Sequence, residues 1–150
     1  MMKTMSKSVQ DFFVKINNNN LIVTCLKINK DILYEITKIA NKITELDLSL
    51  CNICKDRSIF CELLNIFSNC NMLETLKLGL NSINLDDGII IAEALSKCPN
   101  LKNLDFSHNN LSLYENYDKT ELLIKMFQKC TSLIDLNLTG NVYIPLKKTV

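Results

Sequence analysis

The chain has 150 residues, 47% of them hydrophobic, which is enough to bury one sizeable core and argues against intrinsic disorder. Its 17 basic and 16 acidic residues nearly cancel, so the chain has no strong field to attract nucleic acid. No apolar stretch approaches the length of a membrane span, and the N-terminal residues lack the apolar run of a classical signal peptide.

Seven cysteines without such a signal favour a reducing compartment, and an odd number cannot all pair within one chain. We therefore expect one cytoplasmic domain over residues 1–150 with reduced thiols.

The first segment, residues 1–20, is predicted to cap the fold. Apolar residues share one helical face over residues 6–17, with Ser6 or Ser8 as the N-cap, and the Asn run 17–20 ends the helix. These apolar residues are Val9, Phe12, Phe13 and Ile16. A repeat structure needs such cover at its exposed end.

Residues 21–143 contain about five copies of the pattern LxxLxLxx(N/C)x(L). The copies begin at Val23, Ile43, Leu73, Leu101 and Leu133, so their starts are 20, 30, 28 and 32 residues apart, and the first copy is the weakest. Apolar positions 4 and 6 alternate with positions 3, 5 and 7, which is the period of a half-buried strand. Each copy is therefore predicted to begin with a strand.

Position 9 of each copy is predicted to point inward and satisfy backbone groups where the chain leaves the strand. A structural ladder should run through Cys51, Asn81, Asn109 and Asn141. The first copy places Asp31 there, so we expect irregularity at that end.

Helical spacing of apolar residues follows within residues 57–70, 88–98 and 119–130, and the first copy has room only for a short helix. Cys70, Cys98 and Cys130 each lie three residues before the next copy, which indicates a packing role. Residues 144–150 form a C-terminal tail that leaves this end underprotected.

This pattern resembles the ribonuclease-inhibitor-like leucine-rich repeats, whose units combine a strand and a full helix. The resemblance implies an α/β solenoid, a horseshoe segment with a parallel sheet on its concave face and helices on its convex face. The uneven repeat length departs from that family.

The short array and the Lys-, Asn- and Ile-rich composition, typical of AT-rich genomes, also resemble small leucine-rich-repeat effectors of Legionella-type intracellular bacteria. That resemblance implies delivery into a host cell by a specialised secretion system. The partner would then be a host protein or a fellow bacterial effector.

Residues with catalytic potential are few. His108 is the only histidine, and its neighbours Asp105 and Ser107 suggest a hydrolase-like group, although an exposed contact residue is the favoured interpretation. Cys51 and Cys54 form CxxC, but a tetrahedral metal site needs two more ligands. We expect no metal, no cofactor and no enzymatic activity.

The favoured function is a protein-binding module that holds one folded partner on its concave face and nearby loops, and inhibits or regulates a partner enzyme or effector. Alternatives are an adaptor for ubiquitin-type machinery and the hydrolase centred on His108. We expect a monomer that forms a heterodimer with its partner, and no contact with nucleic acid or membrane.

Contact residues are predicted at the outward positions of each copy. The charges at position 5 alternate in sign and should pair into a mixed face, position 7 is small, and Leu50 and Leu80 at position 8 are the preferred anchors. Tyr114 and Tyr117, in a loop, either join the interface or pack on the adjacent helix. The predicted partner-binding residues are Glu45, Asp47, Ser49, Leu50, Lys77, Leu80, Asn103, Asp105, Ser107, His108, Tyr114, Tyr117, Asp135 and Asn137.

Overall fold

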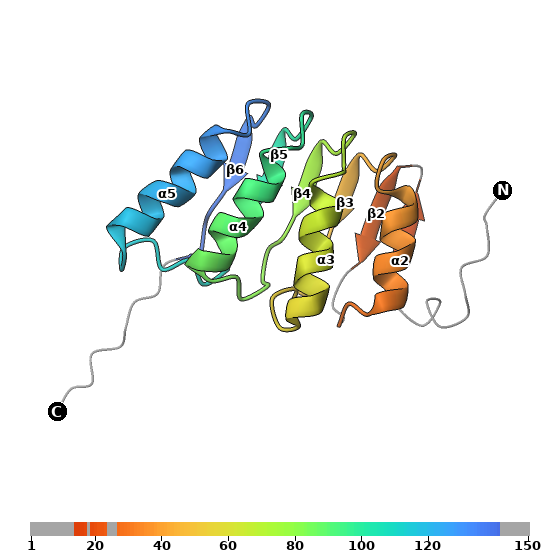
Figure 1. The fold of residues 1–150 in the computed structure, drawn as a ribbon, viewed down its shortest axis with the longest axis horizontal. Coiled ribbons are helices and arrows are strands. Elements are labelled where there is room, and N and C mark those ends of the chain that lie inside the picture. The colour runs from red at the N-terminus through yellow and green to blue at the C-terminus, as the bar shows by residue number, and fades with distance from the viewer. Residues whose placement is uncertain (1–13, 18, 24–26, 142–150) are drawn as a thin grey trace.

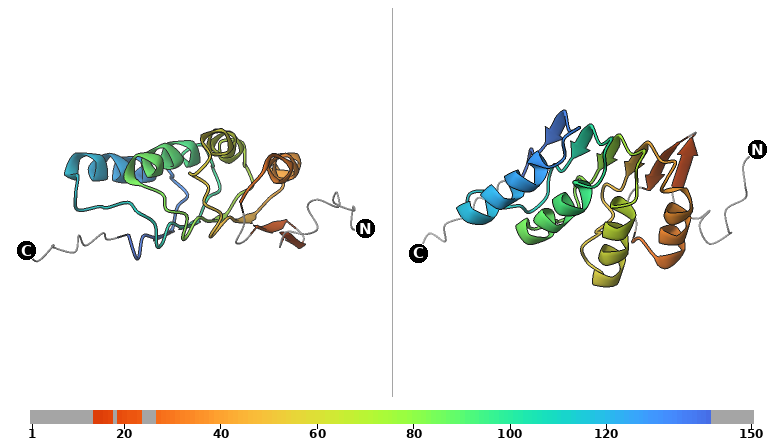
Figure 2. Two further views of the ribbon diagram at one scale, coloured as in Figure 1. Left: turned by 90° about the horizontal axis from the view of Figure 1, so that it is seen from below. Right: turned by 45° about the horizontal axis from the view of Figure 1, so that its top comes forward.

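The computed structural model describes residues 14–17, 19–23 and 27–141 and shows an α/β fold. One six-stranded sheet carries four helices on a single face (Figures 1 and 2). The strands are β1 (Val14–Asn17), β2 (Asn20–Val23), β3 (Glu45–Asp47), β4 (Thr75–Lys77), β5 (Asn103–Asp105) and β6 (Asp135–Asn137). They lie in sequence order, and β2 to β6 are parallel. The predicted α/β class with a parallel sheet is confirmed.

The helices are α2 (Lys30–Ile39), α3 (Arg57–Phe67), α4 (Leu85–Leu95) and α5 (Tyr117–Gln128). Each begins at an Asn or Asp whose side chain accepts a hydrogen bond from a backbone N–H of the first turn, namely Asn29, Asp56, Asn84 and Asn116. These caps start α4 and α5 a few residues before the predicted helical stretches. The longest of the four has 12 residues, so none of the helices described here could cross a membrane.

The core lies between the sheet and the helices. Leu46, Leu76 and Leu104 align on adjacent strands and are almost completely buried, as the two-residue strand period predicts. Cys70, Cys98 and Cys130 are also buried, and the thiol of Cys98 donates to the carbonyl of Phe67 at 2.9 Å. They pack as predicted, at the C-terminal ends of the helices.

The N-terminal end differs from the prediction. Residues 14–17 form strand β1, which pairs antiparallel with β2 and aligns Val14 with Val23, so a helix over 6–17 is wrong for these residues. Residues 6–13 of that helix lie outside the described chain. Asn17 ends β1 and Asn20 begins β2, and the two residues are paired, so the Asn run joins two strands and does not end a helix.

The register of the first unit also differs. Leu21, not Leu26, pairs with Leu46, so this unit begins five residues earlier than the copy predicted from Val23. Asp31 accordingly lies in the first turn of α2 and outside the ladder. The earlier strand also leaves room for a helix of 10 residues, not the short helix expected.

Candidate functional site

The candidate site is the face of the sheet that the helices leave uncovered, here called the outer face (Figure 2). The parallel register places Glu45, Thr75, Asn103 and Asp135 in one row and Asp47, Lys77, Asp105 and Asn137 in a second. This alignment is the one the repeat predicts. At β2 the rows continue with Asn20 and Ile22 instead of Cys25 and Lys27, and Cys25 lies outside the described residues.

Lys77 is the basic residue at the centre of these rows. Its ammonium group contacts Glu45 Oε1 at 2.8 Å, diagonally across to the neighbouring strand. That hydrogen bond raises the pKa of Lys77, and the carboxylates of Glu45, Asp47 and Asp105 add to the effect. Pairing within the face was predicted, but through the charges of position 5 alone.

Two carboxylates of the second row also hold the backbone. Asp47 Oδ1 accepts from the backbone N–H of Ser49 at 3.0 Å, and Asp105 Oδ1 accepts from that of Ser107 at 2.9 Å. Asn137 makes the same bond to Thr139 at 3.1 Å. The sequence signal is Asp or Asn followed two residues later by Ser or Thr, which is typical of Asx turns.

The face is more acidic than the mixed face expected from the sequence. Lys27 is absent from the row, and Lys77 is the one base among the eight residues that β3 to β6 contribute to the two rows. Lys77 pairs with Glu45 and lies between Asp47 and Asp105, so one ammonium group serves three carboxylates. Asp135 has no basic neighbour in these rows.

A ridge of left-handed residues runs beside the rows, where each strand turns. This turn ridge consists of Leu50, Leu80, His108 and Gly140, with φ of 62°, 59°, 52° and 72°. Matching backbone hydrogen bonds join the ridge to the segment that follows the next strand, from Leu50 N–H to Gly79 O and from Leu80 N–H to Ser107 O. Left-handed backbone costs a non-glycine residue about 1–2 kcal/mol. Leu50 and Leu80 adopt this unfavourable backbone although their side chains are exposed, with 44% and 49% of their surface accessible.

The small residues of position 7 serve packing as well as access. Gly79 is buried, and a Cβ there would come within 3.2 Å of Ser107 Oγ. Ser107 itself is only 8% exposed, whereas Ser49 is partly exposed. Of the predicted contact residues, Ser107 therefore offers the least surface.

The loop tyrosines are both available to a partner. Tyr114 is 84% exposed and Tyr117, the first residue of α5, is 80% exposed. The alternative that they pack on the adjacent helix is therefore wrong.

The ladder beneath the turn ridge is built as predicted. Asn109 Oδ1 accepts from the backbone N–H groups of Asn81 and Ile83, and its amide donates to Leu78 O and to Phe106 O of its own turn. Asn81 repeats these contacts one unit earlier, Asn141 donates to Phe106 O, and the Cys51 thiol donates to Val23 O. The ladder thus fixes the left-handed turns that carry Leu50 and Leu80.

His108 lies exposed on the turn ridge with its imidazole close over Gly140. In the part of the chain that the structure describes, no hydrogen bond joins this imidazole to Asp105 or Ser107, and the Asp105 carboxylate is engaged by the Ser107 backbone. The geometry gives the hydrolase arrangement no support.

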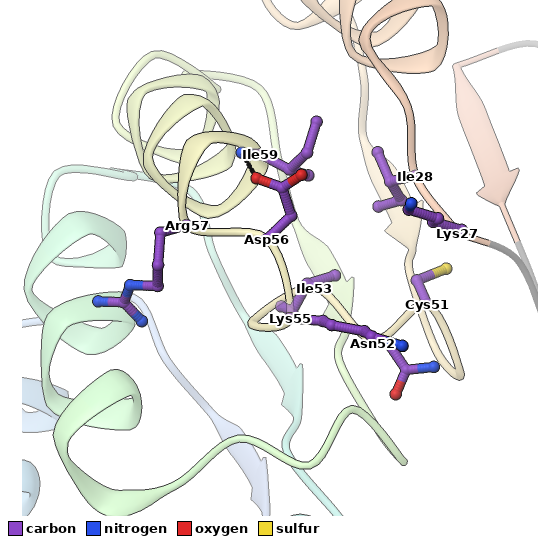
Figure 3. A pocket seen from close by; sticks show the side chains of 9 residues that line it. All are labelled: Lys27, Ile28, Cys51, Asn52, Ile53, Lys55, Asp56, Arg57 and Ile59. Atoms are coloured by element: carbon purple, nitrogen blue, oxygen red, sulfur yellow. Dashed lines mark hydrogen bonds between the residues drawn. The ribbon is translucent and has the colours of Figure 1, made fainter.

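A pocket of about 440 Å³ lies between the segment before α2 and the loop before α3 (Figure 3). Lys27 and Lys55 line it, but Asp56 already caps α3, and Arg57 points away from the other lining residues to pair with Asp87.

Burial raises the pKa of Cys54 to about 12, so this thiol stays protonated and the CxxC pair is poorly suited to redox chemistry. Over residues 14–17, 19–23 and 27–141, no three His, Cys, Asp or Glu side chains gather to hold a metal ion.

The chain matches no model of a known family, and a search of curated proteins finds no match to it.

Proposed function

We propose that this chain is a leucine-rich-repeat solenoid whose outer face and turn ridge bind one folded protein, and that binding inhibits or regulates the partner. The single observation that carries the proposal is the pair of exposed leucines, Leu50 and Leu80, held on left-handed backbone beside the two rows of the outer face. Glycine would suit that backbone better, as Gly140 does in the last unit. An exposed leucine that costs stability at two successive turns is well explained by contact with a partner.

The charge of the face defines the chemistry of that partner. The two rows hold four carboxylates against the one ammonium group of Lys77, so a partner surface with Lys or Arg side chains around an apolar centre complements them. A standard interface buries about 800 Å² on each side. Short strands alone offer less, and the exposed Tyr114 and Tyr117 extend the surface.

The experiment that tests the proposal begins with capture from lysate on the immobilised chain, followed by calorimetry with each captured protein after purification. The Leu50→Asp and Leu80→Asp variants should each weaken binding at least tenfold, because a charge replaces the apolar anchor. Aspartate tolerates left-handed backbone, so both variants should fold. The control is Ile90→Asp on α4, which is 39% exposed on the opposite side and should bind normally.

A second pair of variants isolates charge from structure. Asp47→Asn and Asp105→Asn keep the side-chain oxygen that accepts from the backbone, as Asn137 does, but remove the negative charge. They should slow association and reduce its salt dependence while leaving stability unchanged. If binding survives both the leucine and the aspartate variants, the outer face is not the binding surface.

A further inference from the structure

The C-terminal end of the sheet carries an apolar groove of about 420 Å³. Its apolar walls come from α5, from β6 and its flanks, and from the loop before α5: Leu113, Leu123, Ile124, Phe127, Leu133, Leu136 and Leu138. The three leucines around β6 are partly exposed, whereas their counterparts Leu101, Leu104 and Phe106 in the preceding unit are at most 2% exposed. The groove is the space that one more apolar layer would fill.

The preceding unit shows which residue fills the equivalent space. Leu111 is at position 11 of its copy and packs against Gly88, the fourth residue of the preceding helix α4. A Cβ built on Gly88 would collide with Leu111 Cδ2 and would lie 3.7 Å from the ring of Phe106. Ile53 and Ile83 hold position 11 in the earlier units. All three are at most 1% exposed. An apolar side chain at position 11 therefore enters the core in every unit for which its burial is known.

The corresponding positions of the last unit lie at the groove. The fourth residue of α5 is Thr120, the counterpart of Gly88, and the counterpart of Phe106 is Leu138; both line the groove. Position 11 of the last copy is Tyr143. Asn141, two residues before it, donates from its amide to Leu138 O at 3.0 Å, so the chain leaves Asn141 beside the groove.

We propose that residues 142–146, Val-Tyr-Ile-Pro-Leu, occupy this groove, with Tyr143 seated between Thr120 and Leu138. Tyrosine is larger than the leucine it replaces, but its ring can be buried while its polar tip reaches water. Ile144 and Leu146 add apolar cover, and Pro145 withholds a donor from the edge of the sheet. The segment thus closes the end of the core, independently of any partner on the outer face.

The chain contains no tryptophan, so the fluorescence of a single introduced tryptophan reports on the surroundings of the substituted residue. In the full chain, Tyr143→Trp should emit at shorter wavelength, and acrylamide should quench it several-fold less than the control Tyr114→Trp, whose site is 84% exposed. A second substitution in the groove, Ile124→Asp or Thr131→Asp, should shift the emission of Tyr143→Trp to longer wavelength and restore quenching. The matched control is Leu122→Asp, 42% exposed on the same helix but outside the groove, which should have no effect.

Both groove substitutions replace exposed or half-exposed residues, and circular dichroism checks that the variants fold. Quenching of Tyr143→Trp as efficient as that of Tyr114→Trp would overturn the proposal. Protection of Tyr143→Trp from quenching that persists with either groove substitution would also overturn the proposal. Protection that disappears on dilution would assign the groove to a second copy of the chain instead.

Discussion

At the scale of single residues, the inward amides decide how each strand turns into its loop. Asn109 bonds to backbone groups of two successive units, and it is 6% exposed. Because these groups are shielded from water, no solvent molecule can replace a lost amide without rearrangement. The ladder residues therefore contribute stability out of proportion to their size.

The Asn109→Ala variant should lower the free energy of unfolding by about 3 kcal/mol, because several buried backbone groups lose their partner at once. Urea denaturation followed by circular dichroism measures the change. The neighbouring Asn110→Ala replaces an exposed side chain and should alter stability by less than about 0.5 kcal/mol. Equal effects at the two positions would contradict the role given to the ladder.

The turn ridge leads to the opposite expectation, a substitution that stabilises. Leu80→Gly should raise the free energy of unfolding by about 1 kcal/mol, since glycine adopts φ of 59° without steric cost. Thermal unfolding provides the measurement. Leu80→Ala, which retains the Cβ, should show no such gain, and the glycine variant should also lose affinity for the partner.

At the scale of elements, a buried cysteine follows the C-terminal end of each of the helices α3, α4 and α5. Burial raises the pKa of Cys70 to about 11 and that of Cys98 to about 12. Above pH 9 the unfolded chain releases thiol protons that the folded chain retains, so the folded state binds more protons and stability falls as pH rises.

Stability should therefore drop between pH 8 and pH 10 by about 1 kcal/mol for each buried thiol, measured as the urea midpoint at each pH. Cys98→Ala should reduce this slope. Cys61→Ala, at an exposed position of α3, is the control and should leave the slope as it is. A slope unchanged by Cys98→Ala would contradict the assignment.

The sequence predicts the elements from β3 onward well, because Leu46, Leu76, Leu104 and Leu136 recur at one position and each helix has a periodic apolar face. It fails at β1 and β2. In the sequence, the spacing of Phe12, Phe13 and Ile16 fits a helical face. The pairing of β1 with β2 is made by backbone groups, which a pattern of side chains does not predict.

Within the candidate site, the row of Asp47, Lys77 and Asp105 follows directly from the repeat. The diagonal contact between Lys77 and Glu45 does not, because it depends on side-chain reach across strands. The left-handed φ of Leu50 and Leu80 is equally invisible, since leucine is an unusual choice for such backbone.

At the scale of the whole molecule, the units differ in how well they are covered. Leu76, Leu78 and Leu104 in the middle of the sheet are almost fully buried, whereas Leu136 and Leu138 at β6 are partly exposed. Local opening should therefore begin at the edge, with a lower free energy than global unfolding.

Hydrogen exchange followed by NMR tests this gradient. The amides of Phe106 and His108, which donate to β6 and its flank, should exchange faster than those of Leu78 and Leu80, which donate to β5 and its flank. Uniform protection across the four amides would indicate that the sheet opens only as one cooperative unit.

The sequential order of the strands has a consequence for engineering. Among the described strands, each one from β3 to β5 pairs with its predecessor and its successor in the chain. A tandem duplication of residues 73–100 should therefore insert one more rung between β4 and β5, lengthening the assembly by about 4.8 Å without altering the segments on either side. The width of the sheet can thus be changed by one strand at a time, so the molecule is a suitable scaffold for binding surfaces of different widths.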